Sequence, residues 1–358
     1  MLTLAASSSR TCSRQGDDIV ILFVWEGNEI PILPVLLLSV SLLGSAGGSD
    51  MDHYLGSEYK GNYVWGLAMN LAWNELNENV LREKLKLKTV DKIALRMADQ
   101  LNDAPFTKND LDEKSYYIKS GYGKITVELI NKESRAKFPD KSFEDLKLNL
   151  GPTDIIVYAY FLKKVEYLNQ FKEKDVSFLK ERVKGFYAND ISKDNIRILK
   201  YWDDNKFIVG LRLKDDGDEL ILSKGFDMNN PKDAFNEIER HNKNISLTIS
   251  NDDLFEMPKL HLDHHRGYVE FMGKFLAIKG FEKYFIAQMF ENIKFDMDHK
   301  GARVESEAGM PVAMASEMTK IKRFILDKPF WVVMKRKDSQ HPYFVLGVKN
   351  TELMEKIK

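Results

Sequence analysis

Two histidines and an aspartate stand at alternate positions of the stretch HLDHH, residues 261–265. Alternate residues of a strand point to the same face, so a strand here would bring together His261, Asp263 and His265. Imidazole nitrogens and carboxylate oxygens are common zinc ligands. The same side chains could instead form the exposed polar face of a strand, and the sequence names no fourth ligand. We favour the polar face and predict no bound metal or other cofactor.

The local signatures of catalysis are missing from the sequence. It has no glycine-rich phosphate-binding loop, no GxSxG turn and no HExxH motif. Carboxylates are abundant, but nothing in the sequence pairs two of them. A hydrolase would need a catalytic cluster that the sequence does not show, so the chain is predicted not to be an enzyme.

A different chemistry is indicated by residues 301–323, which show no consistent apolar period. Long loops of this kind are usually functional or disordered. After Gly301, small side chains alternate with mostly charged ones. The small set is Ala302, Val304, Ser306 and Ala308, and the other set is Arg303, Glu305, Glu307 and Gly309. Because alternate side chains of a strand point to opposite faces, a strand formed here would have one small face and one mostly charged face, and Gly301 before it supplies backbone freedom. The alternative is a chance alternation in a solvated loop.

The elements that would position this loop are predicted from hydrophobic periodicity. Helical spacing runs over Val64–Leu101 and recurs at 233–241 and 268–280, whereas 105–150 is mixed. Strands are predicted at Asp154–Leu162, in a hairpin of Phe207–Leu213 with Glu219–Leu222, from Pro258 onward, at 289–298, and in a final pair at 329–337 and 343–349. Helices come mainly first and strands mainly later, so the predicted class is α+β.

The composition is that of a globular protein. The 358 residues are 44% hydrophobic and 30% charged, with a formal net charge of −1. This balance argues against nucleic acid as a partner, because no basic excess exists to neutralise phosphates. The only cysteine is Cys12, so no disulfide forms within the chain.

The N-terminal region contains an apolar run, Ile30–Leu43, followed by GSAGGSD. Fourteen residues with two prolines are too short for a membrane span and fit the core of a signal peptide, although a buried segment of the fold is the alternative. We therefore predict an N-terminal extension with a signal peptide over 1–48 and one domain over 49–358. Residues 1–29 are interpreted as an artefactual extension of the reading frame. The mature chain would be secreted, with a glycosylation sequon at Asn244.

The order of the predicted elements resembles that of the serpins, the superfamily of serine-protease inhibitors. The segments that carry the resemblance are DIIVYAYFL, KFIVGLRLKDDGDELIL, EMPKLHLD and DKPFWVVMKRKDSQHPYFVLGVKN. It covers roughly residues 150–358, and 64–150 only loosely. The implied fold has helices packed on a large mixed sheet, a second sheet or barrel part, and an exposed reactive-centre loop at about 301–323.

The resemblance also implies a function, that of a monomeric, secreted suicide substrate. A serine protease would cut the loop near Ala315-Ser316, form an acyl-enzyme and be trapped when the loop enters the main sheet. The small side chains after Gly301 would then be buried, with Gly301 as the hinge, and the alternation favours this insertion. A small Ala315 would suit an elastase- or chymotrypsin-like pocket. A glycosaminoglycan is a further implied partner, with Arg82, Lys84, Lys86 and Lys88 as its candidate site, against the alternative of a solvated face.

Departures from the family pattern support a second hypothesis, a non-inhibitory carrier or protein-binding protein. Arg303 stands where inhibitory members have glutamate, and His299 where they have an acidic residue. Val165 replaces an expected tryptophan and Val157 an expected asparagine. These positions concern loop insertion more than the fold.

Overall fold

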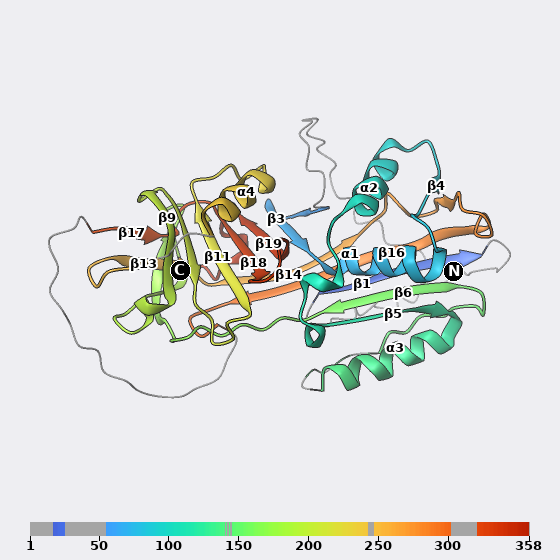
Figure 1. Cartoon of the computed structure of the whole chain (residues 1–358), viewed down its shortest axis with the longest axis horizontal. Coiled ribbons are helices and arrows are strands. Elements are labelled where there is room, and N and C mark those ends of the chain that lie inside the picture. The colour runs from blue at the N-terminus through green and yellow to red at the C-terminus, as the bar shows by residue number, and fades with distance from the viewer. Residues whose placement is uncertain are drawn as a thin grey trace, which may run out of the picture.

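A computed structural model describes residues 17–25, 55–139, 141, 143, 145–242, 247–301 and 321–357. These residues form three sheets and four α-helices. The sheet that contains the longest strand is called the main sheet. Figure 1 shows the long strands of this main sheet in one half of the molecule and the shorter strands of the other two sheets in the other half.

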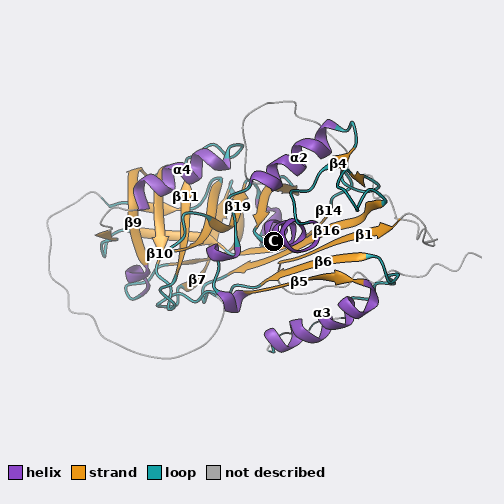
Figure 2. Cartoon of the chain, turned by 45° about the vertical axis from the view of Figure 1, so that its right-hand side comes forward, coloured by secondary structure: helices purple, strands orange, loops and turns teal. Residues whose placement is uncertain are grey.

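The main sheet places an N-terminal strand between two strands from the middle and the end of the chain. Its order is β4 (Leu87–Lys88), β15 (Phe275–Leu276), β16 (Tyr284–Met297), β1 (Asp17–Trp25), β6 (Ile155–Phe161) and β5 (Tyr116–Tyr122), and β14 (Leu260–Gly267) also pairs with β16. β1 is antiparallel to both β16 and β6, so those two strands run parallel to each other. Figure 2 shows β16, β1, β6 and β5 one after another.

The central strands are buried on both faces because both faces carry apolar side chains. On one face, Ile19 and Ile21 pack in the large core with α1 (Ala68–Glu75). On the other, Val20 and Leu22 pack in a smaller core with α3 (Gly123–Lys137). The two helices lie on opposite sides of the sheet (Figure 1).

The other two sheets are built mainly from the C-terminal half. One has the order β12 (Leu247–Thr248), β9 (Ile196–Asp203), β10 (Lys206–Leu211), β11 (Asp218–Lys224), β18 (Phe330–Arg336), β19 (Pro342–Val348), β3 (Asn62–Gly66) and β2 (Ser57–Tyr59). The other has the order β17 (Arg323–Ile325), β13 (Leu254–Pro258), β8 (Glu181–Tyr187) and β7 (Lys172–Phe178). The remaining helices are α2 (Lys92–Asp103) and α4 (Pro231–Asn242).

The α+β class and most predicted elements are confirmed. The continuous apolar run is β6, in which every residue is buried. The predicted hairpin is β10 with β11, and the final strand pair is β18 with β19. The short helix at 233–241 is α4.

Two predictions were wrong in detail. Residues 268–280 form turns and the short strand β15, because their hydrogen bonds run to Ile286 of β16 as well as within single turns. The segment around Pro258 contains two strands, β13 and β14, which belong to different sheets. The mixed region 105–150 also contains a full strand, β5, and the 15-residue helix α3.

The predicted extension over residues 1–48 contains a strand of the main sheet. β1 lies before the apolar run Ile30–Leu43, and this run falls outside the described residues. Removal of residues 1–48 as a leader stays a prediction, and it would take β1 away. Across the part of the chain that the structure describes, no helix combines the length and the apolar character that a membrane span needs.

Candidate strand-insertion site

The predicted reactive loop joins β16 to β17, and the structure describes both of its ends. The last described residue before it is Gly301, and the first after it is Ile321. The predicted insertion residues, the reactive bond and the sequon lie outside the described residues: Ala302, Val304, Ser306, Ala308, Ala315, Ser316 and Asn244.

Gly301 occupies a position that only glycine fits. Its φ of +79° is in the left-handed region, and a Cβ there would lie 2.7 Å from the Cα of Glu166 and 2.8 Å from the backbone nitrogen of Tyr167. Gly301 also forms a β-bridge with Glu166. The loop therefore starts against the chain segment that follows β6.

Replacing Gly301 by alanine should lower the free energy of unfolding by about 2 kcal/mol, because the left-handed conformation alone costs a side chain roughly 1–2 kcal/mol and the backbone of Glu166 must also move. Urea unfolding of the purified variant measures the change. Gly267→Ala is the matched control, since a Cβ at Gly267 meets nothing within 4 Å. Equal losses in the two variants would contradict this account of Gly301.

The segment that receives Gly301 is itself fixed by the β10–β11 hairpin. The backbone nitrogen of Lys214 donates to the carbonyl of Glu166 over 2.8 Å, and their side chains form an ion pair at 2.9 Å. Lys163, just after β6, forms an ion pair with buried Asp218. These contacts hold the exit of β6 to the second sheet.

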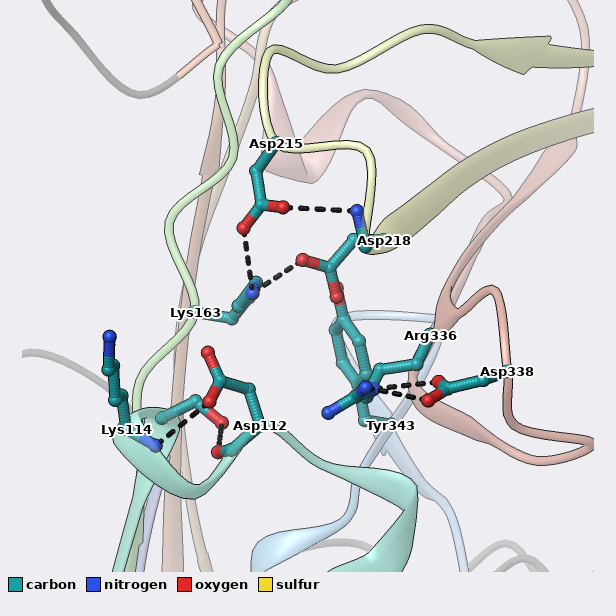
Figure 3. A network of polar contacts seen from close by, with 10 residues as sticks. Asp112, Lys114, Lys163, Asp215, Asp218, Arg336, Asp338 and Tyr343 are labelled. Atoms are coloured by element: carbon teal, nitrogen blue, oxygen red, sulfur yellow. Dashed lines mark hydrogen bonds and ion pairs between the residues drawn. The ribbon is translucent and has the colours of Figure 1, made fainter.

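A polar network surrounds the Lys163 ammonium group. Figure 3 shows Lys163 between Asp215 and Asp218, with Asp215 at 3.8 Å. The Tyr343 hydroxyl donates to Asp218 over 3.3 Å. Burial raises the pKa of the Asp218 carboxyl, although Lys163 acts in the opposite direction. The network balances the charge of the buried Asp218 carboxylate, and its role is structural.

His299 anchors the other side of the loop start. Its carbonyl accepts from the backbone nitrogen of Phe171 over 2.9 Å, and its Nδ1 lies 3.4 Å from Glu173 on β7. Burial lowers the pKa of His299, and Glu173 acts against that shift. The partly buried ring of His299 therefore lies between the start of the predicted loop and β7.

The far end of the loop is held by the third sheet. β17 runs parallel to β13, and the backbone nitrogen of Lys322 donates to Asp253 over 2.7 Å. The buried Lys224 ammonium group reaches across from β11 and donates to the carbonyl of Ile325 over 2.7 Å. Both ends of the predicted loop are thus fixed in well-paired structure.

The strand position between β6 and β16 holds β1. Asp17–Phe23 pair with β6, and Asp18–Trp25 pair with β16. The opposite edge of β16 pairs with β14 and β15. Both edges of the strand that leads into the loop are therefore occupied.

The other sequence-predicted candidates do not gather into a site. His261, Asp263 and His265 lie exposed on β14 and contact Asp296, Lys294 and Asn292 of β16, respectively. The described residues contain no group of three potential metal ligands. This arrangement matches the polar strand face that the sequence favoured.

The predicted basic face at residues 82–88 is partly neutralised. Lys84 pairs with Asp103 at 2.7 Å and Lys86 with Glu83 at 2.8 Å. Arg82 has a left-handed φ of 63°, and Lys88 lies on β4, so these residues do not share one helix face.

Sequence reasoning missed a basic cleft of about 230 Å³. It lies between the turn before β5, the end of α3 and the exit of β6, and its lining is Lys114, Lys137, Phe138, Pro139, Lys141, Leu162 and Lys164. No linear signal marks it, because three separate segments supply the four lysines.

No protein-family model matches the chain, and a search of curated protein sequences found no match. Among solved structures, native protease nexin-1 with heparin matches with a TM-score of 0.50 and 12% identity, over 81% of this chain and 92% of that chain. Serpin48 from the insect Tenebrio molitor matches with a TM-score of 0.48 and 13% identity, over 82% and 92%. Human thyroxine-binding globulin with its hormone matches with a TM-score of 0.42 and 12% identity, over 67% and 77%.

Proposed function

We propose, from the serpin-like fold that the described chain has, that the chain without residues 1–48 is a secreted inhibitor of a serine protease. One observation carries the proposal. β6 and β16 run parallel with a strand between them that is antiparallel to both, and the predicted loop leaves the end of β16 directly. A loop that folds back beside β16 would run in this same direction.

The chemistry of the trap belongs mainly to the protease. Its serine oxygen would attack the carbonyl carbon of Ala315, the peptide bond would break, and Ser316 would leave with a new amino group. The ester to Ala315 would persist if the cut loop entered the sheet before water reached it. This chain would supply only the loop and the strand position, with no catalytic group of its own.

The test uses the chain 49–358 with elastase- and chymotrypsin-type proteases. We expect a band at the summed mass that survives a denaturing gel, and a new amino terminus at Ser316 or within one or two residues of it. Cleavage in this region without a covalent band would contradict inhibition.

Two charge variants sharpen this experiment. Val304→Glu puts a charge into the set that insertion would bury, so the loop should become a plain substrate and the covalent band should fall at least about tenfold. Glu305→Lys, in the other set, keeps a charge where the loop already carries one and should leave the band unchanged. Equal effects of both variants would contradict the assigned insertion face.

A second candidate function is favoured by β1 itself. While residues 17–25 fill the position between β6 and β16, the loop has no place to enter. A chain that keeps them would be a non-inhibitory carrier or protein-binding protein. Expression in a secretory cell distinguishes the two forms. N-terminal sequencing should find a start near residues 47–50 for the inhibitor and a start before residue 17 for the carrier. Removal of N-glycans should shift the mass if Asn244 is modified.

A sulphated glycosaminoglycan is the proposed second partner, since the basic cleft gathers four lysines around an apolar floor. The related structure of protease nexin-1 contains heparin. The double variant Lys137→Ala/Lys164→Ala should bind heparin more weakly, with a salt slope lower by about 2. Lys84→Ala/Lys86→Ala is the control, since both lysines already have acidic partners. A larger loss in that control would assign the site to residues 82–88.

A further inference from the structure

β1 is held in the main sheet by pairing on both sides and by burial on both faces. Ile19, Val20, Ile21 and Phe23 have no exposed surface, and Leu22 is 6% exposed. β1 pairs with Ile155–Phe161 on one side and with Tyr284–Asn292 on the other. A strand buried in this way contributes apolar surface to both cores of the molecule.

The strands on either side of β1 are secured without it. β6 pairs with β5 on its other edge, and α3 packs on both of these strands. β16 pairs with β14 over Phe290–Met297 and with β15 at Phe285. β6 and β16 therefore each stay paired on their other edge if β1 leaves. The position between them then remains available to another strand.

β1 can also be detached from the rest of the chain by a single backbone cut. Only residues 26–54 link it to the next described segment, so one cut in that stretch would turn β1 into a peptide held by non-covalent contacts alone. No other described element follows β1 before Leu55. The predicted leader cleavage near residues 47–50 is a cut of this kind.

We propose that β1 is an internal, releasable ligand of the strand position between β6 and β16. The ligand class is an extended peptide with apolar, mostly β-branched or aromatic side chains, as in IVILFVW of residues 19–25. The backbone groups of β6 and β16 supply the hydrogen bonds, and the two cores select the side chains.

The consequence for protease trapping rests on the proposed function. The set Arg303, Glu305 and Glu307 is charged, whereas β1 is apolar at every residue from Ile19 to Leu22. β1 therefore fits a site with two apolar faces better than the loop does, and it should exclude the loop. Loss of residues 17–25 would be the step that makes the chain competent to trap a protease.

The test compares the full chain with the chain 49–358, and uses a synthetic peptide of residues 17–25 with lysines added for solubility. The shorter chain should unfold roughly 10 °C lower, because it loses five buried apolar side chains. The peptide should bind it one to one and restore most of the difference. The same peptide with Ile21→Asp is the matched control and should not bind, since Ile21 is fully buried. Equal unfolding temperatures of the full chain and the chain 49–358 would overturn the proposal. So would a shorter chain that folds but does not bind the peptide.

A second protein covers the case in which the chain 49–358 does not fold. A protease site placed within residues 30–50 of the full chain allows β1 to be cut off after folding. Retention of the fragment through gel filtration, and its exchange for labelled peptide in dilute urea, would support the proposal. Loss of the fragment with no uptake of peptide would overturn it.

The two proposals fail separately. Peptide binding without any covalent protease complex would leave the proposal for β1 standing and remove the inhibitor function. Equal covalent complex from the full chain and the chain 49–358 would leave the inhibitor function standing and show that β1 does not exclude the loop.

Discussion

Acidification from pH 7 to pH 4 should cost the folded chain about 3 kcal/mol through one side chain, His264 of β14. The ring is 6% exposed, its Nε2 lies 2.9 Å from the Ser57 hydroxyl oxygen, and it packs against the ring of Tyr59. Burial, with smaller contributions from Arg266 and His265, lowers the pKa of His264 from 6.5 to about 4. No hydrogen-bond partner for Nδ1 is found among the described residues, so a second ring proton would be buried without an acceptor.

The direction follows from proton linkage. Because the pKa is lower in the folded state, the unfolded chain binds more protons between pH 6.5 and 4. The contribution of the neutral ring is complete above pH 6.5 and is lost as pH falls toward 4. Urea unfolding at each pH unit measures it. His264→Gln should flatten this part of the profile, and His265→Gln, at an exposed neighbour with a minor contribution, should keep most of it. An unchanged profile in His264→Gln would contradict the assignment.

Lys224→Met should lower the free energy of unfolding by about 3 kcal/mol, because three oxygen atoms lose the buried ammonium group that donates to them. Lys224 is 2% exposed. It donates to the carbonyls of Asp204 at 3.1 Å and Ile325 at 2.7 Å, and pairs with Asp327 at 2.5 Å. The two carbonyls would be left without this donor, whereas half-exposed Asp327 can be solvated, which places the cost at the lower end for a broken buried pair.

The control for this variant lies close by in the chain. Lys328 is exposed and its ammonium group donates to the Asn205 side chain over 2.8 Å, so Lys328→Met should change stability by less than about 0.5 kcal/mol. Urea unfolding of both variants distinguishes the buried from the exposed site. A loss below 1 kcal/mol in Lys224→Met, in the range of an ordinary surface pair, would show that β17 is not held by this side chain.

Local patterns predicted those elements whose neighbours do not change their meaning. β6 is an unbroken run of β-branched and aromatic residues, and such a run has few other places than the centre of a sheet. The hairpin β10–β11 carries its own turn, KDDGD, and was predicted for that reason. The helical spacing at 268–280 misled, because the same apolar residues reach the core from successive turns.

β1 shows why a correct local pattern can still be assigned to the wrong context. Residues 19–25, IVILFVW, are as strand-like as β6, but the neighbouring run Ile30–Leu43 suggested a leader and drew this segment into it. Pairing partners more than a hundred residues away decide its place, and no short-range rule contains them. The same reason hid the basic cleft, whose lysines approach one another only in the folded chain.

The position of β1 in the sheet also sets an order of events during synthesis. β1 is made before either neighbour, yet Ile19 pairs with Ala159 and Glu291, so the ribosome must add most of the chain before the second partner exists. Closing so long a loop is slow compared with local pairing. A peptidase that acts on the growing chain would therefore compete with translation and folding. The relative rates of cleavage and of β1 pairing would decide whether a given molecule keeps β1 in its main sheet.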